Sequence, residues 1–271
     1  MSLVLQISDL HFGTELPPVV AALLALAQEK QPDTLILSGD ITQRGTSKQF
    51  AAARTFVDRL GIPRHLVLAG NHDIPLLNPV LRFLRPYARH RRAFGDALEP
   101  EIETADLLAV GVKTTRRWRH KDGVVSDAQI ERIAARLRAA SATQLRIVVT
   151  HQPIEVCRER DIHNRLHNHA AAARAWTEAG ADLVLGGHIH LPYVVALNQR
   201  NPDLPRRAWC VQAGTAVSSR IRREASNSVN LIRHDAARPL HCSVERWDYN
   251  PAAARFLPIE RSDLPLDRGT S

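Results

Sequence analysis

Cysteine is scarce in this sequence. Only three of the 271 residues are cysteines, Cys157, Cys210 and Cys242, and none of them stands in a C-x-x-C spacing. An odd and dispersed set of this kind argues against a disulfide framework and against a zinc knuckle. We interpret the three as reduced thiols that act as small hydrophobic side chains in a reducing compartment.

The sequence also lacks a long apolar run and a recognisable leader. No apolar stretch approaches the roughly 18 residues of a membrane span, and Met1 is followed directly by the strand-like SLVLQIS. We therefore expect a cytoplasmic protein without membrane association. The four tryptophans are scattered along the chain, so no stacking platform for single-stranded nucleic acid is visible.

Lysine is rare as well, although the chain is basic. The formal net charge is +8, but only four of the 36 basic residues are lysine and the rest are arginine. Such a skew can arise from genome base composition alone, so the charge carries little weight as a sign of a polyanionic partner. Nucleic acid is therefore not favoured as a partner, whereas a smaller phosphorylated substrate remains compatible with the charge.

Short runs of aliphatic and β-branched residues recur along the chain and predict buried strands. They are apolar throughout rather than alternating, which is typical of strands buried on both faces. The predicted strands are 3–7, 34–37, 65–68, 145–149 and 182–185. Helical patterns occur at 18–30, 46–60, 126–140 and 168–179, and two of them open with the capping boxes Thr46–Gln49 and Ser126–Gln129. The alternation predicts βαβ units with a largely parallel sheet covered by helices.

The character of the sequence changes after residue 190. Strand-like pieces follow at 193–197, 208–212, 228–232 and 240–247, and hairpins that complete or face the first sheet would explain them. From Asn250 onward three prolines favour a surface tail. Without an internal repeat or a linker, the sequence predicts one domain, 1–271, with a core of about 1–248 and a C-terminal tail, 249–271.

Polar side chains follow each of the five predicted strands of the first part. In chain order the motifs are SDLH (8–11), GDIT (39–42), GNHD (70–73), THQP (150–153) and GGHIH (186–190). Because ligands bind outside the carboxyl ends of strands in open α/β sheets, we expect all five motifs at one sheet edge. Burying so many polar groups without partners would cost free energy, and bound divalent cations would remove that cost.

Seven of these side chains are candidate metal ligands, namely Asp9, His11, Asp40, Asn71, His151, His188 and His190. Seven ligands exceed the needs of one ion and suit two ions that share a carboxylate, about 3.5–4 Å apart. Imidazole, carboxylate and amide groups without a thiolate favour Mn, Fe, Zn or Co over Ca or Mg alone. Two such ions would lower the pKa of a shared water and supply a hydroxide at neutral pH.

In their order, D-x-H, GD, GNHD, a single histidine after a strand and GH-x-H resemble the five motifs of the calcineurin-like metallophosphoesterases, over residues 9–190. The resemblance implies a four-layer α/β/β/α sandwich, in which two mixed β-sheets pack face to face and are flanked by helices. It also implies a dinuclear site at the edge of that sandwich, with Mn²⁺, Fe²⁺/Fe³⁺ or Zn²⁺ as its ions.

The resemblance assigns a role to each side chain of the motifs. One ion would be held by Asp9, His11, Asp40 and His190, and the other by Asp40, Asn71, His151 and His188. His72 would lie beside the metals, contact the substrate phosphate and protonate the leaving oxygen, while Asp73 would orient its imidazole. Asn71 would contact the substrate as well.

The opening SDLH and the motif GNHD look most like the bacterial class III cyclic-nucleotide phosphodiesterases. Gln43 stands where purple acid phosphatases carry a tyrosine, and Asp73 departs from the GNHE of protein Ser/Thr phosphatases. The expected reaction is hydrolysis of a phosphodiester, of a cyclic or other small nucleotide. Alternatives are a metal-dependent DNA nuclease, a pyrophosphohydrolase of a nucleotide-linked lipid precursor, and a non-catalytic binding scaffold. Family members are often dimeric, so a homodimer is an assembly to test.

Two arginine-rich segments, 82–92 and 114–121, follow GNHD in the stretch expected to form a cap or long loops near the site. Arg116 is the candidate for binding substrate phosphate or a nucleobase, and Arg220 and Arg222 are weaker ones.

The histidine-rich run 163–169 looks like a metal tract, but the seven ligands above already fill two sites. We interpret it as a helix N-terminus capped by Asn168, with His163 or Asn164 near the mouth of the pocket.

Overall fold

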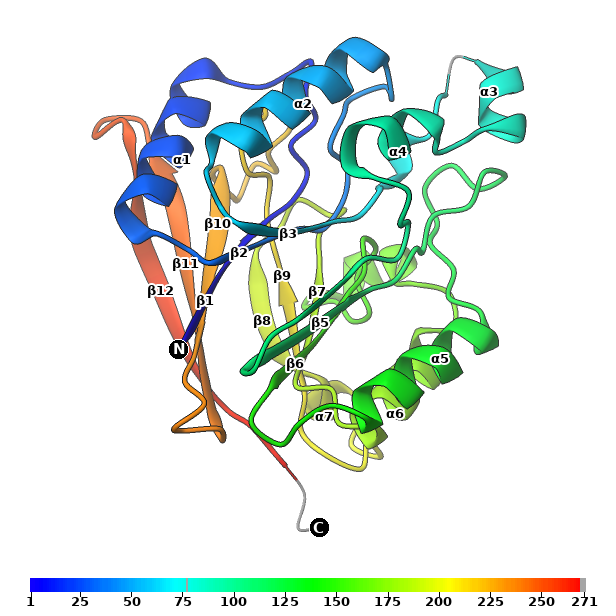
Figure 1. Ribbon diagram of the computed structural model, residues 1–271, viewed down its shortest axis with the longest axis vertical. Helices are drawn as coiled ribbons and strands as arrows, with labels where there is room; N and C mark the ends of the chain where they lie inside the picture. The colour runs from blue at the N-terminus through cyan, green and yellow to red at the C-terminus, as the bar shows by residue number, and fades with distance from the viewer. Residues whose placement is uncertain (77, 269–271) are drawn as a thin grey trace.

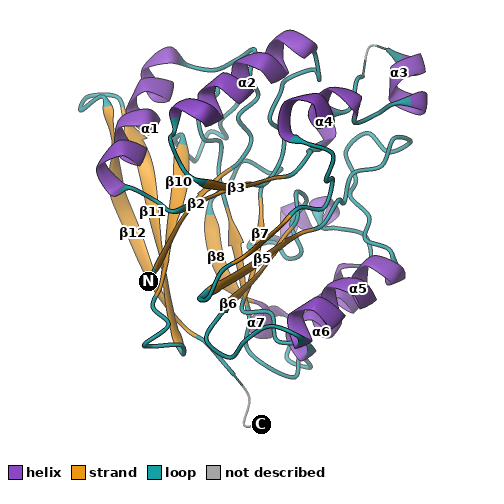
Figure 2. Ribbon diagram, viewed as in Figure 1, coloured by secondary structure: helices purple, strands orange, loops and turns teal. Residues whose placement is uncertain are grey.

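Two six-stranded sheets pack face to face in the computed structural model, which describes residues 1–76 and 78–268, and helices cover the outer side of each sheet (Figures 1 and 2). The predicted four-layer α/β/β/α sandwich is therefore confirmed. Among the described residues, no helix is both long enough and apolar enough to cross a membrane. The three cysteines are free thiols, as expected.

The first sheet has the strand order β12-β11-β10-β1-β2-β3. Its strands are β1 (Ser2–Ile7), β2 (Thr34–Leu37), β3 (Arg64–Val67), β10 (Ser228–His234), β11 (His241–Asn250) and β12 (Arg255–Pro265). β1, β2 and β3 run parallel, with Val4 opposite Thr34 and Thr34 opposite Arg64. The ladder from β1 through β10 to β12 is antiparallel. The three parallel strands therefore end at one edge of this sheet.

The second sheet has the strand order β4-β5-β6-β7-β9-β8. Its strands are β4 (Glu101–Glu103), β5 (Leu107–Gly111), β6 (Leu145–Val149), β7 (Leu183–Gly186), β8 (Tyr193–Ala196) and β9 (Trp209–Gln212). The four central strands are parallel, and β4 and β8 are antiparallel edges. Both sheets are thus mixed, each with a parallel part.

Side chains alternate between two apolar layers along each central strand. Val4 of β1 lies in the core between the sheets, whereas Leu5 packs under the outer helices. In β6, Ile147 faces the first sheet and Val148 faces the helices of its own side. Because successive Cβ atoms of a strand point to opposite faces, a strand buried on both faces is apolar at most positions. The exception in β1 is the buried Gln6, whose side chain donates to the carbonyl of Gly186 at 3.1 Å.

The helices form the two outer layers. The long ones are α1 (Pro17–Lys30), α2 (Ser47–Arg59), α5 (Asp127–Arg138) and α6 (His169–Glu178), and the short ones are α3 (Pro79–Leu84), α4 (Ala88–Phe94) and α7 (Leu197–Arg200). α1 and α2 lie over the first sheet, and α5 and α6 over the second (Figure 1). Both predicted capping boxes are present, since Thr46 and Ser126 accept from the backbone N–H of the residue three positions on, at 3.3 Å each.

The expected tail from residue 249 is wrong for most of its length. Residues 255–265 form β12, the edge strand of the first sheet, paired antiparallel with β11. An edge strand can contain prolines because one of its sides donates no hydrogen bonds to a neighbour. Pro258 lies opposite Trp247, and Pro265 opposite His241, without ending the pairing.

Two further expectations need correction. The five strands with polar motifs do not share one sheet: β1, β2 and β3 belong to the first, and β6 and β7 to the second. Asn168 precedes α6 but makes no cap hydrogen bond; its side chain donates to Asp127 instead, at 2.8 Å. The predicted strands do not include β5, although its segment LLAVG is buried throughout.

Candidate metal centre

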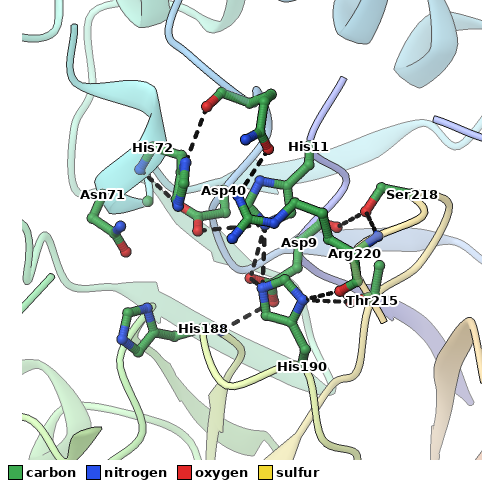
Figure 3. A network of polar contacts seen from close by, with 12 residues as sticks. Asp9, His11, Asp40, Asn71, His72, His188, His190, Thr215, Ser218 and Arg220 are labelled. Carbon is green, nitrogen blue, oxygen red and sulfur yellow. Dashed lines mark hydrogen bonds and ion pairs between the residues drawn. The ribbon is translucent and has the colours of Figure 1, made fainter. Parts of the chain in front are cut away.

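The carboxyl ends of five parallel strands from both sheets meet at one end of the sandwich, and all seven candidate ligands converge there. β1, β2 and β3 are followed by Asp9 and His11, by Asp40 and by Asn71; β6 is followed by His151, and β7 by His188 and His190. Figure 3 shows most of these side chains turned toward one another. The sequence thus identified the whole group, although it placed it on one sheet.

The first group of side chains contains Asp9, His11, Asp40 and His190, whose nearest ligand atoms all lie within 4.8 Å of one another. His190 Nε2 lies 3.4 Å from Asp9 Oδ1 and 3.2 Å from His11 Nε2. His11 Nε2 lies 3.7 Å from Asp40 Oδ2. Two carboxylates and two imidazoles therefore surround one point.

The second group contains Asp40, His151 and His188, again with ligand atoms within 4.8 Å of one another. His151 Nε2 lies 3.3 Å from Asp40 Oδ1 and 3.1 Å from Asn71 Oδ1. Asp40 belongs to both groups, one carboxylate oxygen toward each. This is the arrangement of a carboxylate that bridges two ions.

Hydrogen bonds fix which ring nitrogen faces the centre. Nδ1 of His151 donates to the backbone carbonyl of Ser38 at 2.9 Å, and Nδ1 of His190 donates to the carbonyl of Arg220. A histidine whose Nδ1 carries the proton presents the lone pair of Nε2. In both imidazoles Nε2 is therefore the nitrogen that faces the centre and that would bind a metal once it carries no proton.

The backbone of the ligand loops is strained. Among the described residues, eight that are not glycine have a positive φ, and five of these eight are candidate ligands, namely Asp9, His11, Asp40, His188 and His190. Their φ values lie between 43° and 71°, a left-handed region that costs free energy for residues with a Cβ. Strain of this kind persists where function requires a geometry that the chain would not adopt by itself.

The pKa values of these groups follow from burial and from the charge of Asp40. Burial lowers the pKa of His11 to about 2, and burial together with His151 lowers that of His188 to about 3, so both are neutral at pH 7. Burial opposes a charge on His151, but the Asp40 carboxylate outweighs it and raises the pKa to about 9. Burial alone would raise the pKa of Asp40 too, yet the neighbouring imidazoles, His151 above all, hold it well below its usual range. Asp40 therefore stays an anion.

A cavity of about 410 Å³ opens above this centre. Its lining residues are Asp40, Asn71, His72, Lys121, Asn164, His188, Ile189, His190, Arg220, Ile221 and Arg222. The floor is thus the ligand cluster, and the wall carries three cationic side chains. Asn164, Arg220 and Arg222, which the sequence placed near the pocket, line the cavity.

Comparison with known proteins identifies the family. The profile of the calcineurin-like phosphoesterases matches residues 2–192. The chain belongs to this family.

A similar sequence from Synechococcus sp. is described as a probable cyclic nucleotide phosphodiesterase. It is 35% identical over 79 residues, which cover 26% of this chain and 31% of that protein. The match therefore spans under a third of the length of the relative.

Solved structures with the same fold include a dimetal phosphatase from Danio rerio, 13% identical with a TM-score of 0.68, where the alignment covers 98% of this chain and 99% of the other. A purple acid phosphatase from yellow lupin (Lupinus luteus) seeds is 12% identical with a TM-score of 0.69, over 97% of this chain and 53% of the other. A Vps29 single mutant from Entamoeba histolytica is 12% identical with a TM-score of 0.52, over 97% and 99%. At these identities the likeness is one of fold.

The residues present fit the metal ions on which calcineurin-like phosphoesterases depend. Asp9 Oδ1 and Nδ1 of His188 are buried, and neither has a hydrogen-bond partner within residues 1–76 and 78–268. A buried polar atom without a partner is costly, and a bound cation removes the cost by accepting its lone pair. The orphaned atoms lie in the two groups described above, one in each.

Asp73 does not orient the imidazole of His72, so that expectation is wrong. Its carboxylate accepts from the backbone N–H of Gly70, Ile41 and Thr42 at 2.8–3.1 Å, and from the Thr42 hydroxyl at 2.8 Å. The imidazole of His72 is oriented by another group, because its Nδ1 donates to the backbone carbonyl of Gln43 at 3.0 Å. Asp73 therefore links the loop after β2 to the loop after β3 through its own hydrogen bonds.

Arg116 does not line the cavity either. Its guanidinium donates to the carbonyls of Lys113 and Thr115 and to the side chain of Gln129, at 2.7–3.1 Å. These contacts hold Arg116 at the start of α5. Of the segment 114–121, Lys121 rather than Arg116 lines the cavity. The contact of Gln43 with Arg220 was not predicted from the sequence, because only the folded loops bring the two together.

Proposed function

We propose that this protein hydrolyses the phosphodiester bonds of small nucleotides, cyclic ones included, with the help of two transition-metal ions. The observation that carries the proposal is the position of Asp40 between two groups of ligands. Its Oδ2 lies 3.7 Å from His11 Nε2, and its Oδ1 lies 3.3 Å from His151 Nε2. Two ions that share a carboxylate are the arrangement of many phosphoester hydrolases.

One ion would be held by Asp9, His11, Asp40 and His190, and the other by Asp40, Asn71, His151 and His188. Imidazole, carboxylate and amide donors without a thiolate favour manganese, iron or zinc. When bound, the ions supply a water-derived nucleophile at neutral pH and the positive charge that stabilises the transition state. The chain contributes the strained loops that hold the ligands and the hydrogen bonds that fix their tautomers.

His72 would deliver the proton to the leaving oxygen. Its ring contacts that of His11 edge to face, with centroids 4.8 Å apart, and it lines the cavity. Because Nδ1 donates to the Gln43 carbonyl, Nε2 is the nitrogen that can carry a proton to the substrate. The backbone N–H of His72 donates to Asp40 Oδ1 at 2.8 Å, which ties the position of the imidazole to the shared carboxylate.

The preference for a nucleotide is supported by the partial similarity to the Synechococcus protein. The cavity of about 410 Å³ falls in the range of small-molecule sites, roughly 300–1,000 Å³. The proposed binding partner of this protein is therefore a small nucleotide substrate. Asn71, on the floor of the cavity, would contact it. A cytoplasmic location is consistent with three free thiols.

The test is a screen of protein from which metal has been removed and then restored. Protein loaded with Mn²⁺, Fe²⁺ or Zn²⁺ should hydrolyse bis(p-nitrophenyl) phosphate and nucleotide diesters, and the metal-free protein should not. Monoesters, pyrophosphates, and single- and double-stranded DNA complete the panel, and faster hydrolysis of DNA would favour a nuclease. If protein with two ions per chain hydrolysed none of these compounds, the proposal would be wrong and a binding scaffold would be favoured.

A further inference from the structure

Arg220 lies in the wall of the cavity, and its backbone is part of the metal centre. It belongs to the connection between β9 and β10, and it lines the cavity together with Asp40, His72 and His190. Its carbonyl oxygen accepts from Nδ1 of His190 and from the hydroxyl of Thr215, the latter at 2.9 Å. The chain position of Arg220 is therefore fixed relative to a candidate ligand (Figure 3).

The guanidinium of Arg220 keeps its charge uncompensated. Its Nη1 donates to the amide oxygen of Gln43 at 2.9 Å, a neutral partner. Among the ion pairs of the described residues, none within 4.0 Å joins Arg220 to a carboxylate. The neighbouring Arg222 differs, because Asp161 at 3.2 Å and Glu224 at 3.4 Å neutralise it. Of the two arginines in this wall, Arg220 is the one whose charge is available to a ligand.

The guanidinium of Arg220 has N–H donors left for a ligand. A guanidinium has five N–H donors, and the Gln43 contact uses one of them. The remaining donors form a planar fork, whose geometry matches two oxygens of a phosphoryl group.

Gln43 connects this guanidinium to His72. Its side-chain oxygen accepts from Arg220, and its backbone carbonyl accepts from Nδ1 of His72. One residue thus places two groups that face the same cavity. A carboxylate at position 43 would hold the guanidinium equally well but would cancel its charge, so the neutral amide preserves the charge while fixing the direction.

We propose that Arg220 binds a phosphoryl oxygen of the substrate and that Gln43 is its positioning residue. This inference rests on the proposed function, since it assigns the phosphate-binding cation of the same site. The ligand chemistry is that of a phosphate mono- or dianion, whether it comes from a diester substrate or from the monoester product.

The experiment measures binding of inorganic phosphate to the Mn²⁺-loaded protein by isothermal titration calorimetry, so its readout does not depend on turnover. Arg220→Gln should weaken phosphate binding about 10- to 100-fold, the loss of a charge-assisted pair of hydrogen bonds. The phosphate affinity of Arg220→Lys should lie between those of wild type and Arg220→Gln, because lysine keeps the charge but not the planar pair of donors. Every variant is assayed for manganese content, which should stay at the wild-type value because the backbone carbonyl at position 220 is retained.

Two variants at position 43 separate the effect of the direction of the Arg220 guanidinium on phosphate binding from the effect of its charge. Gln43→Glu should weaken phosphate binding nearly as much as Arg220→Gln, because a carboxylate beside Arg220 neutralises it. Gln43→Leu should weaken binding less, since the charge remains but its direction is lost. Arg116→Gln, outside the cavity, serves as the matched control and should bind phosphate normally.

Wild-type affinity in Arg220→Gln, or in Gln43→Glu, would overturn the assignment, and so would the absence of phosphate binding to wild-type protein with its manganese bound. Loss of manganese from Arg220→Gln would also overturn it, because the side chain would then act on the metal centre. A wild-type protein that bound phosphate through Arg220 but hydrolysed no ester would contradict the proposed function alone.

Discussion

Asp73 and Thr42 join the loop after β3 to the loop after β2: Oδ1 of Asp73 accepts from both the backbone N–H and the hydroxyl of Thr42, at 2.8 Å each. The other oxygen accepts from the N–H of Ile41 and Gly70. Asp40 and Asn71 stand next to these partners in the chain, one in each loop. The distance between these two candidate ligands therefore depends on a side chain that binds no metal.

Asp73→Asn should destabilise the protein by about 3 kcal/mol, because the amide nitrogen cannot accept from the two backbone donors that face it. Urea unfolding in the presence of EDTA measures this loss, and the exposed Asp96→Asn is the matched control, expected within about 0.5 kcal/mol of wild type. A variant with normal stability but reduced kcat would instead return Asp73 to the role of orienting His72.

Gly70 is a second residue that binds no metal but determines where the candidate ligand Asp40 lies. A Cβ at Gly70 would lie 2.1 Å from the backbone nitrogen of Asp40 and 2.2 Å from its Oδ1, and backbone atoms cannot move aside as a flexible side chain can. Gly70→Ala should therefore displace the shared carboxylate, lower the metal content and abolish turnover. The matched control is Gly61→Ala, where φ is +67° but no atom lies within 4 Å; it should cost only about 1 kcal/mol and keep both ions. Metal analysis of purified protein distinguishes the two, and a full complement of metal in Gly70→Ala would contradict the close contact.

Local sequence patterns predicted the strands and the ligands for a physical reason. A strand buried on both faces is mostly apolar, and polar side chains cluster just beyond its end at the sheet edge. Asp9, Asp40 and His151, each within three residues of a strand end, could therefore be found by position alone. Which strands pair is not a local property. β1 and β6 have similar apolar sequences yet belong to different sheets, and nothing in either segment records that.

The direction of a side chain in a loop is equally non-local. Arg116 and Arg220 have the same chemistry and both occur in arginine-rich segments, but Gln129 binds the first away from the cavity and Gln43 holds the second in its wall. β12 was missed because its prolines and charges are unusual in a central strand, whereas an edge strand tolerates them. These features depend on contacts between residues far apart in the sequence.

The role proposed for His72 predicts a dependence on the leaving group. His72→Ala should keep both ions and lose about 10²- to 10⁴-fold in kcat on a nucleotide diester, whose alkoxide leaving group needs a proton. The loss should be much smaller on bis(p-nitrophenyl) phosphate, because nitrophenolate leaves without one. The exposed His241→Ala, at the start of β11, is the control and should retain normal rates. An equal loss on both substrates would assign His72 to phosphate binding rather than to proton transfer.

A buried histidine outside the site predicts how stability depends on pH. His90 of α4 is buried, its ring lies against Phe50 and Phe94, and neither ring nitrogen has a hydrogen-bond partner among the described residues. Burial, followed by the charge of Arg91, lowers its pKa from 6.5 to about 4. The folded state therefore resists the proton that the unfolded chain takes up.

Between pH 6.5 and pH 4 the unfolded state binds this proton and the folded state does not, so His90 should lower the free energy of unfolding by up to about 1.4 kcal/mol for each pH unit of acidification. The contribution is absent above pH 6.5 and levels off below pH 4. His90→Leu removes the titrating group and fits an apolar site. Its free energy of unfolding should therefore fall less steeply with acidification over this window, and the slope should differ from that of wild type by up to the value for one proton, about 1.4 kcal/mol per pH unit. Urea unfolding at half-unit steps of pH, with His163→Leu as the exposed control, measures the difference in slope. Parallel curves for His90→Leu and wild type would mean that His90 is protonated in the folded protein, which the apolar contacts of its ring argue against.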